Sequence, residues 1–339
     1  MGRFFANKLE KGALMQELGL LLDIGRKYWS LDEIKSLMLI MNKAKMTHLQ
    51  LHFSENLGFR LELPTLKLDP SENRFTKTEV AEILNFASEL DLEVIPDFDA
   101  PGHLDTLLKN YPQYILPETS NSALDVTNDE AIQWLFGIYD EILDWFPNCK
   151  SIHIGGDEFI DFRNIQHYPY LLRKSREKFG PNASGIEFYV AFINQLTRHL
   201  KLKGLDVRIW NDGLLRSDLT SLVNLNPTVE VTYWTNWDPS MANVSTWLEA
   251  GYTLINFCDN DLYYVLGNNA GYIIPTVDRL KHEAKKNKFS GGQYLNANEM
   301  AQVKGTYFSV WADLPNMKTC EEILYDLDSL LPTFYEIYH

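Results

Sequence analysis

Residues 151–159, SIHIGGDEF, decide how the rest of the chain is interpreted. The first residues are apolar enough for a short buried strand, and Gly155-Gly156 ends that strand in a tight turn where backbone can approach a ligand closely. Two carboxylates, Asp157 and Glu158, follow directly. Neighbouring strand residues point to opposite faces, so these acids can share a pocket only if the strand has ended. They form either a catalytic pair or the cap and first turn of a helix, and the glycine break favours catalysis.

Working outward, this strand is one of eight short apolar runs that alternate with helical patterns. The predicted strands are 17–24, 47–53, 92–98, 151–154, 205–210, 229–234, 252–257 and 305–311. The predicted helices are 30–45, 76–90, 104–109, 128–145, 185–202 and 319–338, and residues 163–184 are expected to form a long polar loop. Alternation of strands with helices indicates a parallel sheet, and eight units favour a closed barrel. We therefore predict an α/β fold, a single (β/α)8 TIM barrel over residues 1–339, with 1–15 as an N-terminal extension packed on it.

Composition excludes several classes of partner. The 339 residues carry a net charge of −15, which argues against nucleic acid and anionic membranes, since both require clustered Lys and Arg. Cys149, Cys258 and Cys320 match no metal spacing and are typical of reduced thiols. There is no apolar run of about 18 residues and no signal-like N-terminus. We expect a cytoplasmic protein, or a secreted one if a signal has been trimmed, and assign no oligomeric state.

Active sites of such barrels lie at the carboxyl ends of the strands, so the residues that end each strand are the informative ones. They are Arg26, His52, Glu55, Asp99, His103, Asp157, Glu158, Trp210, Asp212, Trp234, Tyr263, Trp311 and Asp313. Three tryptophans among acids and an arginine indicate a sugar site, because aromatic faces stack on sugar C–H faces while charged groups bind hydroxyls. Any one of these tryptophans could instead be packing under loops, as we expect for Trp29, Trp134, Trp145 and Trp247.

The motif H-I-G-G-D-E at 153–158 resembles that of glycoside hydrolase family 20, the β-N-acetylhexosaminidases. The resemblance extends over LLDIGR (21–26), HLQLHFSEN (48–56), VIPDFDAPGH (94–103), RIWNDG (208–213), VTYW (231–234) and SVWAD (309–313). It is strongest to the dispersin-like branch, which has a bare catalytic barrel. The resemblance implies a retaining, substrate-assisted mechanism, an exception to the usual pair of carboxylates about 5–5.5 Å apart.

By this resemblance Glu158 is the general acid and then the base, Asp157 holds the substrate's acetamido N–H, and Tyr263 bonds the acetamido oxygen. Substrate binding is assigned to Arg26, His103, Trp210, Asp212, Trp234, Trp237, Trp311 and Asp313. His52, Glu55, Asp99 and His153 are expected to support them from behind, with His103 and Glu55 tuning the pKa of Glu158. No cofactor and no metal are expected.

Each assignment has an alternative. Arg26 could form an ordinary ion pair with Asp23 or Asp157, and His153 is read as a core histidine. His52, His103 and Asp157 could hold a metal, but they lack ligand spacing in the sequence. Tyr264 could replace its neighbour Tyr263, because a slip of one residue turns the side chain to the opposite face.

The chain also departs from the family pattern at three places. Glu55-Asn56 stands where two aspartates are common, Tyr263-Tyr264-Val265 replaces Y-L-D, and Trp311-Ala312-Asp313 replaces W-x-E. The last two changes affect groups that would bind hydroxyls 4 and 6. The preference between GlcNAc and GalNAc therefore does not follow from the sequence.

The main hypothesis is an exo-acting hydrolase of terminal β-linked N-acetylhexosamine, most often GlcNAc, in β-N-acetylhexosaminide oligosaccharides. One alternative is a dispersin-like depolymerase of β-1,6-poly-N-acetylglucosamine. Another is a catalytically inactive sugar-binding barrel, against which the intact Asp157, Glu158 and Tyr263 argue.

Overall fold

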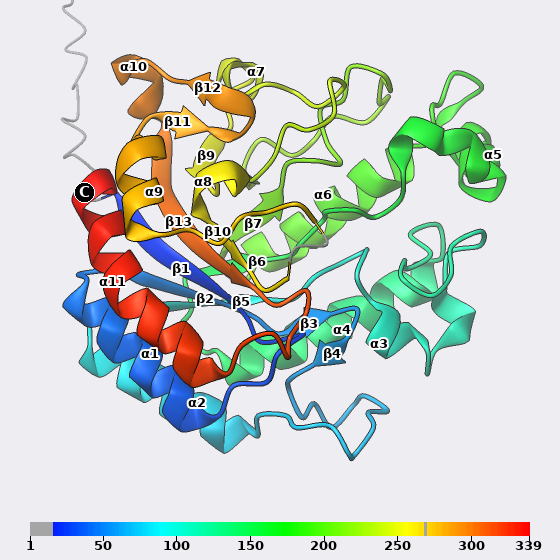
Figure 1. Ribbon diagram of the computed structural model, residues 1–339. Helices are drawn as coiled ribbons and strands as arrows, with labels where there is room; N and C mark the ends of the chain where they lie inside the picture. Colours follow the sequence, from blue (N-terminus) through cyan, green and yellow to red (C-terminus); the bar gives the residue numbers. More distant parts are fainter. Residues whose placement is uncertain (1–15, 268–269) are drawn as a thin grey trace, which may run out of the picture.

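The computed structural model describes residues 16–267 and 270–339, so the predicted N-terminal extension, residues 1–15, lies outside the described part. Eight parallel strands form the centre (Figure 1): β1 (Glu17–Asp23), β2 (His48–His52), β5 (Glu93–Asp97), β6 (Ser151–His153), β7 (Asp206–Trp210), β8 (Glu230–Tyr233), β9 (Thr253–Asn256) and β13 (Val303–Trp311). Each pairs with the next, and β13 returns to pair with β1, Phe308 opposite Leu20. The predicted closed (β/α)8 barrel is confirmed.

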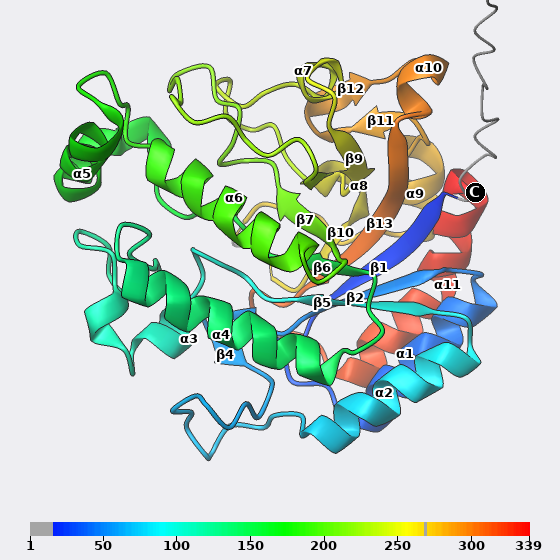
Figure 2. The same cartoon turned by 180° about the vertical axis from the view of Figure 1, so that it is seen from behind.

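Helices surround the barrel: α1 (Leu31–Lys43), α2 (Lys77–Glu89), α4 (Asp129–Trp145), α6 (Glu187–Lys201), α7 (Val244–Glu249), α9 (Val277–Glu283) and α11 (Cys320–Tyr338). The predicted capping box opens α1, where the Ser30 hydroxyl accepts from the Glu33 N–H and the Glu33 carboxylate accepts from the Ser30 N–H. Figure 2 shows α4 and α6 adjacent, with the rings of Phe136 and His199 4.8 Å apart between them. None of the described helices is long and apolar enough to cross a membrane.

Shorter elements lie in the connections. They are the strands β3 (Ser54–Glu55), β4 (Gly58–Phe59), β10 (Tyr263–Val265), β11 (Lys288–Phe289) and β12 (Gln293–Tyr294), the helices α3 (Asp105–Leu108), α8 (Asp259–Leu262) and α10 (Ala297–Met300), and the 3₁₀ turns η1 (Pro112–Tyr114), η2 (Phe162–His167) and η3 (Ser290–Gly292). β9 pairs with the first half of β13 and β10 with its last residues, Ser309–Trp311. β10 thus continues the sheet at its carboxyl end and brings Tyr263 there.

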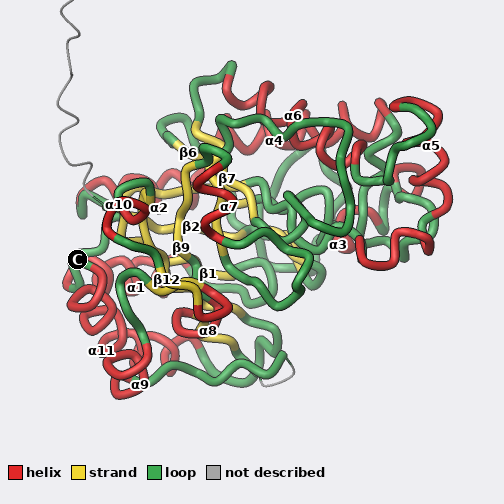
Figure 3. Tube along the Cα trace, turned by 90° about the horizontal axis from the view of Figure 1, so that it is seen from above, coloured by secondary structure: helices red, strands yellow, loops and turns green. Residues whose placement is uncertain are grey.

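The expectation of a polar loop over 163–184 is wrong, because this segment contains helix α5 (Pro169–Phe179). Only Leu171, Leu172 and Ser175 of α5 are buried, so its apolar stripe is too thin to stand out in the sequence. Pro169 begins the helix, and Gly180, at φ 107°, follows its end. Figure 3 shows α5 on the same side of the barrel as α3, away from α9 and α11.

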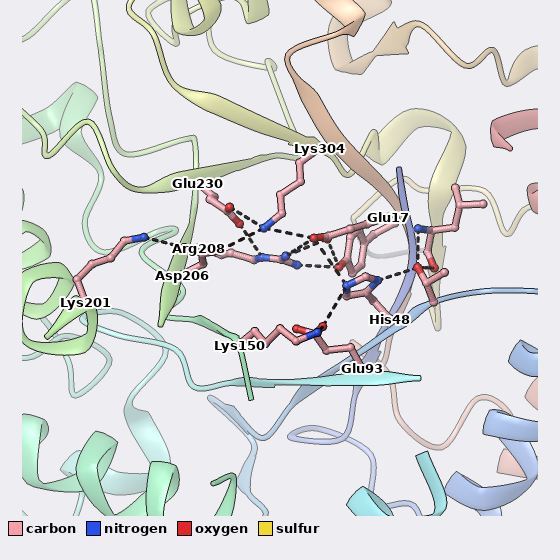
Figure 4. A network of polar contacts seen from close by, with 12 residues as sticks. Glu17, His48, Glu93, Lys150, Lys201, Asp206, Arg208, Glu230 and Lys304 are labelled. Atoms are coloured by element: carbon pink, nitrogen blue, oxygen red, sulfur yellow. Dashed lines mark hydrogen bonds and ion pairs between the residues drawn. The ribbon is translucent and has the colours of Figure 1, made fainter. Parts of the chain in front are cut away.

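A buried ionic network fills the amino-terminal end of the barrel (Figure 4). Arg208 is fully buried and pairs with Glu17 at 2.8 Å and with Glu230 at 3.1 Å. Burial raises the pKa of Glu17, but the charges of Arg208, His48 and Lys304 outweigh it, so the net pKa is lowered. Gly19 is required beside the network, since a Cβ there would lie 2.1 Å from the Tyr307 ring.

Replacing Arg208 by Met is expected to lower the free energy of unfolding by about 3 kcal/mol, because it leaves two buried carboxylates short of their main partner. Urea unfolding followed by circular dichroism measures this change. Lys43→Met, which removes an exposed pair with Asp328 at 2.7 Å, is the control and should cost less than about 1 kcal/mol. Equal losses in the two variants would contradict the importance given to the network.

Candidate active site

The turn after β6 separates the two acids. Gly155 and Gly156 have φ of 71° and 93°, and a Cβ on Gly155 would lie 1.2 Å from Oδ1 of Asp99. The Asp99 carboxyl therefore packs directly against the turn, and only glycine fits there. Glu158 follows with φ 45°, a left-handed conformation for a residue with a side chain. As a result the Asp157 side chain is 16% exposed and that of Glu158 is 56% exposed, and the helix-cap alternative does not apply, since no helix begins here.

A cavity of about 250 Å³ opens at the carboxyl ends of the barrel strands. Its lining consists of Arg26, Glu55, His103, Asp157, Glu158, Trp210, Trp234, Trp237, Tyr263, Val265, Ala270, Tyr272, Trp311 and Asp313. The structure thus brings the three predicted catalytic residues together with seven of the eight predicted substrate-binding residues. Asp212 lies behind this wall, and His52, Asp99 and His153 are buried.

His103 lies at the centre of the carboxylates. Its Nδ1 is 3.3 Å from Glu55, while its Nε2 is 3.4 Å from Asp157 and 3.5 Å from Glu158. Burial lowers the pKa of His103, but the charges of Glu55 and Asp157 raise it more, so the pKa lies well above its usual value. The imidazole is therefore a cation held between acids.

Asp99 and Asp157, two neighbouring carboxyl groups, differ in protonation. Asp99 is buried behind Asp157, and burial together with the Asp157 charge raises the pKa of Asp99 well above its usual value. Burial also raises the pKa of Asp157, but the His103 charge lowers it more, and the net pKa is below the usual value. Asp157 is thus the ionised member of the pair that it forms with Asp99.

Glu158 has the opposite shift from Asp157. Burial raises the pKa of Glu158, the His103 charge lowers it, and the charges of Asp157 and Glu55 add to the rise, leaving the net pKa above the usual value. A carboxylic acid with a raised pKa at the mouth of a cavity is suited to donating a proton. One residue is therefore an acceptor inside the cavity, and its neighbour is a donor at the edge.

Aromatic rings wall the cavity. Trp234 and Tyr263 stack with their planes 2° apart and their centroids at 6.1 Å, while Trp210 and Trp311 lie 6.2 Å apart. Tyr264 points away from the cavity and its hydroxyl donates to Asp326 at 2.6 Å. Tyr263, not Tyr264, therefore faces the site.

Arg26 closes one end of the cavity. Its guanidinium lies 2.9 Å from Asp23, 2.6 Å from Glu55 and 3.9 Å from Asp313. The pair with Asp23 that the sequence offered as an alternative is present, and it holds the Arg26 side chain in place rather than removing it from the cavity. Arg26 and Asp313 together present a cation and a carboxylate to any ligand.

Buried histidines support the aromatic wall. His52 is 3.0 Å from Asp97 and its ring meets Trp311 edge-on at 5.2 Å. His153 lies 3.4 Å from the other Asp97 oxygen and 2.8 Å from the Thr232 hydroxyl, with its ring 4.5 Å from Trp210. Asp97 thus contacts both histidines, each of which packs against one tryptophan of the cavity wall. Its role does not follow from the sequence, because the predicted strand extends to residue 98, whereas in the structure Asp97 is the last residue of β5.

Asp212 contacts the site from behind. One of its oxygens accepts from the backbone N–H of Glu158 at 3.0 Å and the other from the indole N–H of Trp234 at 3.0 Å. Only 6% of Asp212 is exposed. Both carboxylate oxygens are thus bonded within the protein. Asp212 therefore positions Glu158 and Trp234 relative to each other, whereas the sequence predicted a contact with the substrate.

Tyr272 is a further residue that the sequence analysis missed. It lines the cavity, and its hydroxyl donates to Asp259 at 3.2 Å. It ends no strand of the barrel and lies in the connection between β10 and α9. No local pattern identifies such a residue, because its position depends on how the connection folds back over the barrel.

Two groups of side chains bring possible metal ligands within 4.8 Å of one another: His52, Glu55 and Asp99, and Asp99, His103 and Asp157. Asp99 belongs to both groups and His103 to the second. Because a metal ion binds ionised carboxylates and neutral imidazole, its binding to the second group would release protons from Asp99 and His103, whose pKa values are both raised.

Residues 18–326 match the sequence profile described as glycosyl hydrolase family 20, catalytic domain. The chain belongs to this family. It is 27% identical over 281 residues to lacto-N-biosidase of Bifidobacterium bifidum, covering 79% of this chain and 24% of that protein. It is also 25% identical to a chitooligosaccharidolytic β-N-acetylglucosaminidase of Ostrinia furnacalis, covering 74% and 46%. The chain thus spans less than half of either relative. The fold matches dispersin B with a TM-score of 0.77 at 22% identity, covering 95% of this chain and 99% of that one.

Replacing His103 by Gln is expected to raise the pKa of both Asp157 and Glu158, because the cation that favours their ionised forms is lost. Titration of ¹³C-labelled carboxyl groups by NMR measures both values. His199→Gln, which removes a histidine paired with Asp140 on the outer surface, is the control and should leave both unchanged. Unchanged titration in the His103 variant would mean that His103 is neutral in the native protein.

Proposed function

We propose that this protein is a retaining exo-β-N-acetylhexosaminidase that removes terminal β-linked GlcNAc, or GalNAc, from oligosaccharides by substrate-assisted catalysis. The observation that carries the proposal is the pair of consecutive acids with opposite pKa shifts, Asp157 lowered and Glu158 raised, at an aromatic-walled cavity. Membership of the family and its β-N-acetylglucosaminidase relative support the assignment.

Consecutive acids favour a nucleophile from the substrate. A pair of protein carboxylates that flank a glycosidic bond normally comes from separate strands. Here one acid is turned into the cavity and the other toward its mouth, so Asp157 is placed to hold a group on the bound sugar while Glu158 serves the bond being cleaved.

In the first step the proton of Glu158 passes to the glycosidic oxygen as the bond from that oxygen to the anomeric carbon breaks. The acetamido carbonyl oxygen of the same sugar forms a bond to the anomeric carbon, giving an oxazolinium ion. The ionised Asp157 accepts the acetamido N–H and balances the positive charge that develops there. Tyr263 donates to the acetamido oxygen, and the parallel rings of Trp234 and Tyr263 form an aromatic wall beside that group.

In the second step the Glu158 carboxylate takes a proton from water as the water oxygen attacks the anomeric carbon. The oxazoline ring opens, the acetamido group is restored, and the configuration of the starting glycoside is retained. Arg26 and Asp313, a cation and a carboxylate that line the cavity, are placed to bind the hydroxyls of a terminal sugar. Val265 lines the cavity where the family pattern has an acid, so hydroxyl binding at that wall is weaker here.

A dispersin-like depolymerase of β-1,6-poly-N-acetylglucosamine is a second candidate. It is favoured by the near-complete match of the two barrels, since 99% of the dispersin B chain is covered. Release of fragments longer than one sugar from that polymer supports this candidate, whereas stepwise release of monosaccharide supports the first.

Parallel assays of aryl β-GlcNAc, β-GalNAc and β-glucoside test the proposal. We expect hydrolysis of the acetamido sugars and none of the glucoside, because the glucoside has no internal nucleophile. Glu158→Gln should reduce turnover of unactivated substrates by roughly a hundredfold or more while binding persists. Efficient glucoside hydrolysis would exclude substrate assistance. Binding without turnover in the wild-type protein would instead indicate an inactive sugar-binding barrel.

Replacing Asp212 by Asn tests the support of the proton donor. Both partners of Asp212 are N–H donors, so the amide NH2 of an isosteric asparagine must face one of them and leave it unpaired. An unpaired buried donor costs about 1–3 kcal/mol, so kcat should fall roughly tenfold with a small rise in KM. Asp144→Asn, in an exposed pair with Lys77, is the control. Changes in kcat and KM no larger than those of the control would show that Asp212 has no positioning role.

A further inference from the structure

A second hollow adjoins the active-site cavity. It has a volume of about 260 Å³ and shares exactly two lining residues of the first cavity, Glu158 and Trp237. A third hollow also reaches Trp237 but not Glu158. Trp237 therefore separates the three hollows. Glu158, the proton donor, lines the first cavity and the second hollow but not the third.

The second hollow is built from two segments that are distant in the sequence. Arg163, in η2 after β6, lies with its guanidinium 4.8 Å from the ring centroid of Trp237, which follows β8. Asp161 fixes the guanidinium through two contacts, at 2.9 Å to Nε and 3.3 Å to Nη2. Trp237 is 53% exposed, unlike Trp210 and Trp311 in the first cavity. An exposed indole held by a fixed cation is a preformed platform.

The chemistry of the second hollow suits a sugar ring. Phe159, Phe162 and Met241 provide apolar surface, and the Trp237 ring provides an aromatic face for ring C–H groups. Arg163 and Asp161 present a donor and an acceptor at the edge, where hydroxyl groups can pair with both. Arg216 is committed to Asp218 and Asp238, so it acts as part of the wall.

We propose that the second hollow binds the leaving group of the reaction, the sugar on the far side of the bond that is cleaved, with Trp237 and Arg163 as its determinants. The inference rests on the proposed function. Glu158 lies between the two hollows, so its proton reaches the oxygen that joins a sugar in the first to a sugar in the second. When that bond breaks, the sugar in the second hollow departs with the new hydroxyl.

The test compares two substrates with the same terminal sugar. One is whichever of the β-1,3-, β-1,4- and β-1,6-linked GlcNAc disaccharides is cleaved fastest, and the other is the β-fluoride of GlcNAc, whose leaving group is a single ion. The quantity measured is kcat/KM for the disaccharide divided by kcat/KM for the fluoride. We expect Trp237→Ala and Arg163→Ala each to lower this ratio at least tenfold, and Trp237→Phe to retain most of it.

Arg173→Ala is the matched control, since Arg173 lies on α5 in an exposed pair with Glu177, and its ratio should equal that of the wild type. Melting temperatures of all variants show that they fold. Equal losses on both substrates, or an unchanged ratio in both test variants, overturn the leaving-group site while leaving the proposed function intact. A wild-type protein that cleaves neither substrate overturns the proposed function and this site with it.

Discussion

The site depends on the contact between the Asp99 carboxyl and the Gly155 backbone. Because Asp99 occupies the place where a Cβ would be, the chain after β6 must pass in left-handed conformation through two glycines. That path turns Asp157 inward to His103 and leaves Glu158 at the mouth, although the two residues are consecutive. A regular strand would have separated them to opposite faces of the barrel wall. The same contact places a neutral acid directly behind an ionised one, so the constraint is electrostatic as well as steric.

One cation sets the protonation of several acids. His103 lies within 3.5 Å of Glu55, Asp157 and Glu158. The pKa of each of these carboxyl groups also depends on its own burial and on its distance from other charges. Glu55 and Asp157 are stabilised as anions, whereas Glu158 has a raised pKa because burial and neighbouring anions outweigh the same cation. Three carboxyl groups of similar intrinsic pKa thereby take different protonation states around one histidine.

The sequence was informative wherever a residue ends a barrel strand, because strand direction alone fixes which end of the barrel it reaches. Arg26, His103, Trp210 and Trp311 were placed this way, and all four line the cavity. Connections follow no such rule. Helix α5 buries too few residues to show a period, and Tyr272 enters the cavity from a returning segment. The two hydrogen bonds of Asp212 depend on atoms in the turn after β6 and in the segment after β8. The local sequence pattern predicts the barrel strands and the residues at their ends. The positions of residues in the long connections depend on three-dimensional packing and cannot be predicted in this way.

The active-site cavity and the second hollow are built mainly from different kinds of segment. The first cavity is formed by strand ends whose positions the closed sheet fixes, and its tryptophans are held by buried histidines and Asp97. The second hollow is formed by η2 and by the segment after β8, which meet through the contact of Arg163 with Trp237. Substitutions in those two segments alter what packs beside Glu158 without moving the backbone turn that orients it. If the proposed function holds, the terminal sugar and the leaving sugar are bound by separate parts of the chain that meet at Glu158 and Trp237.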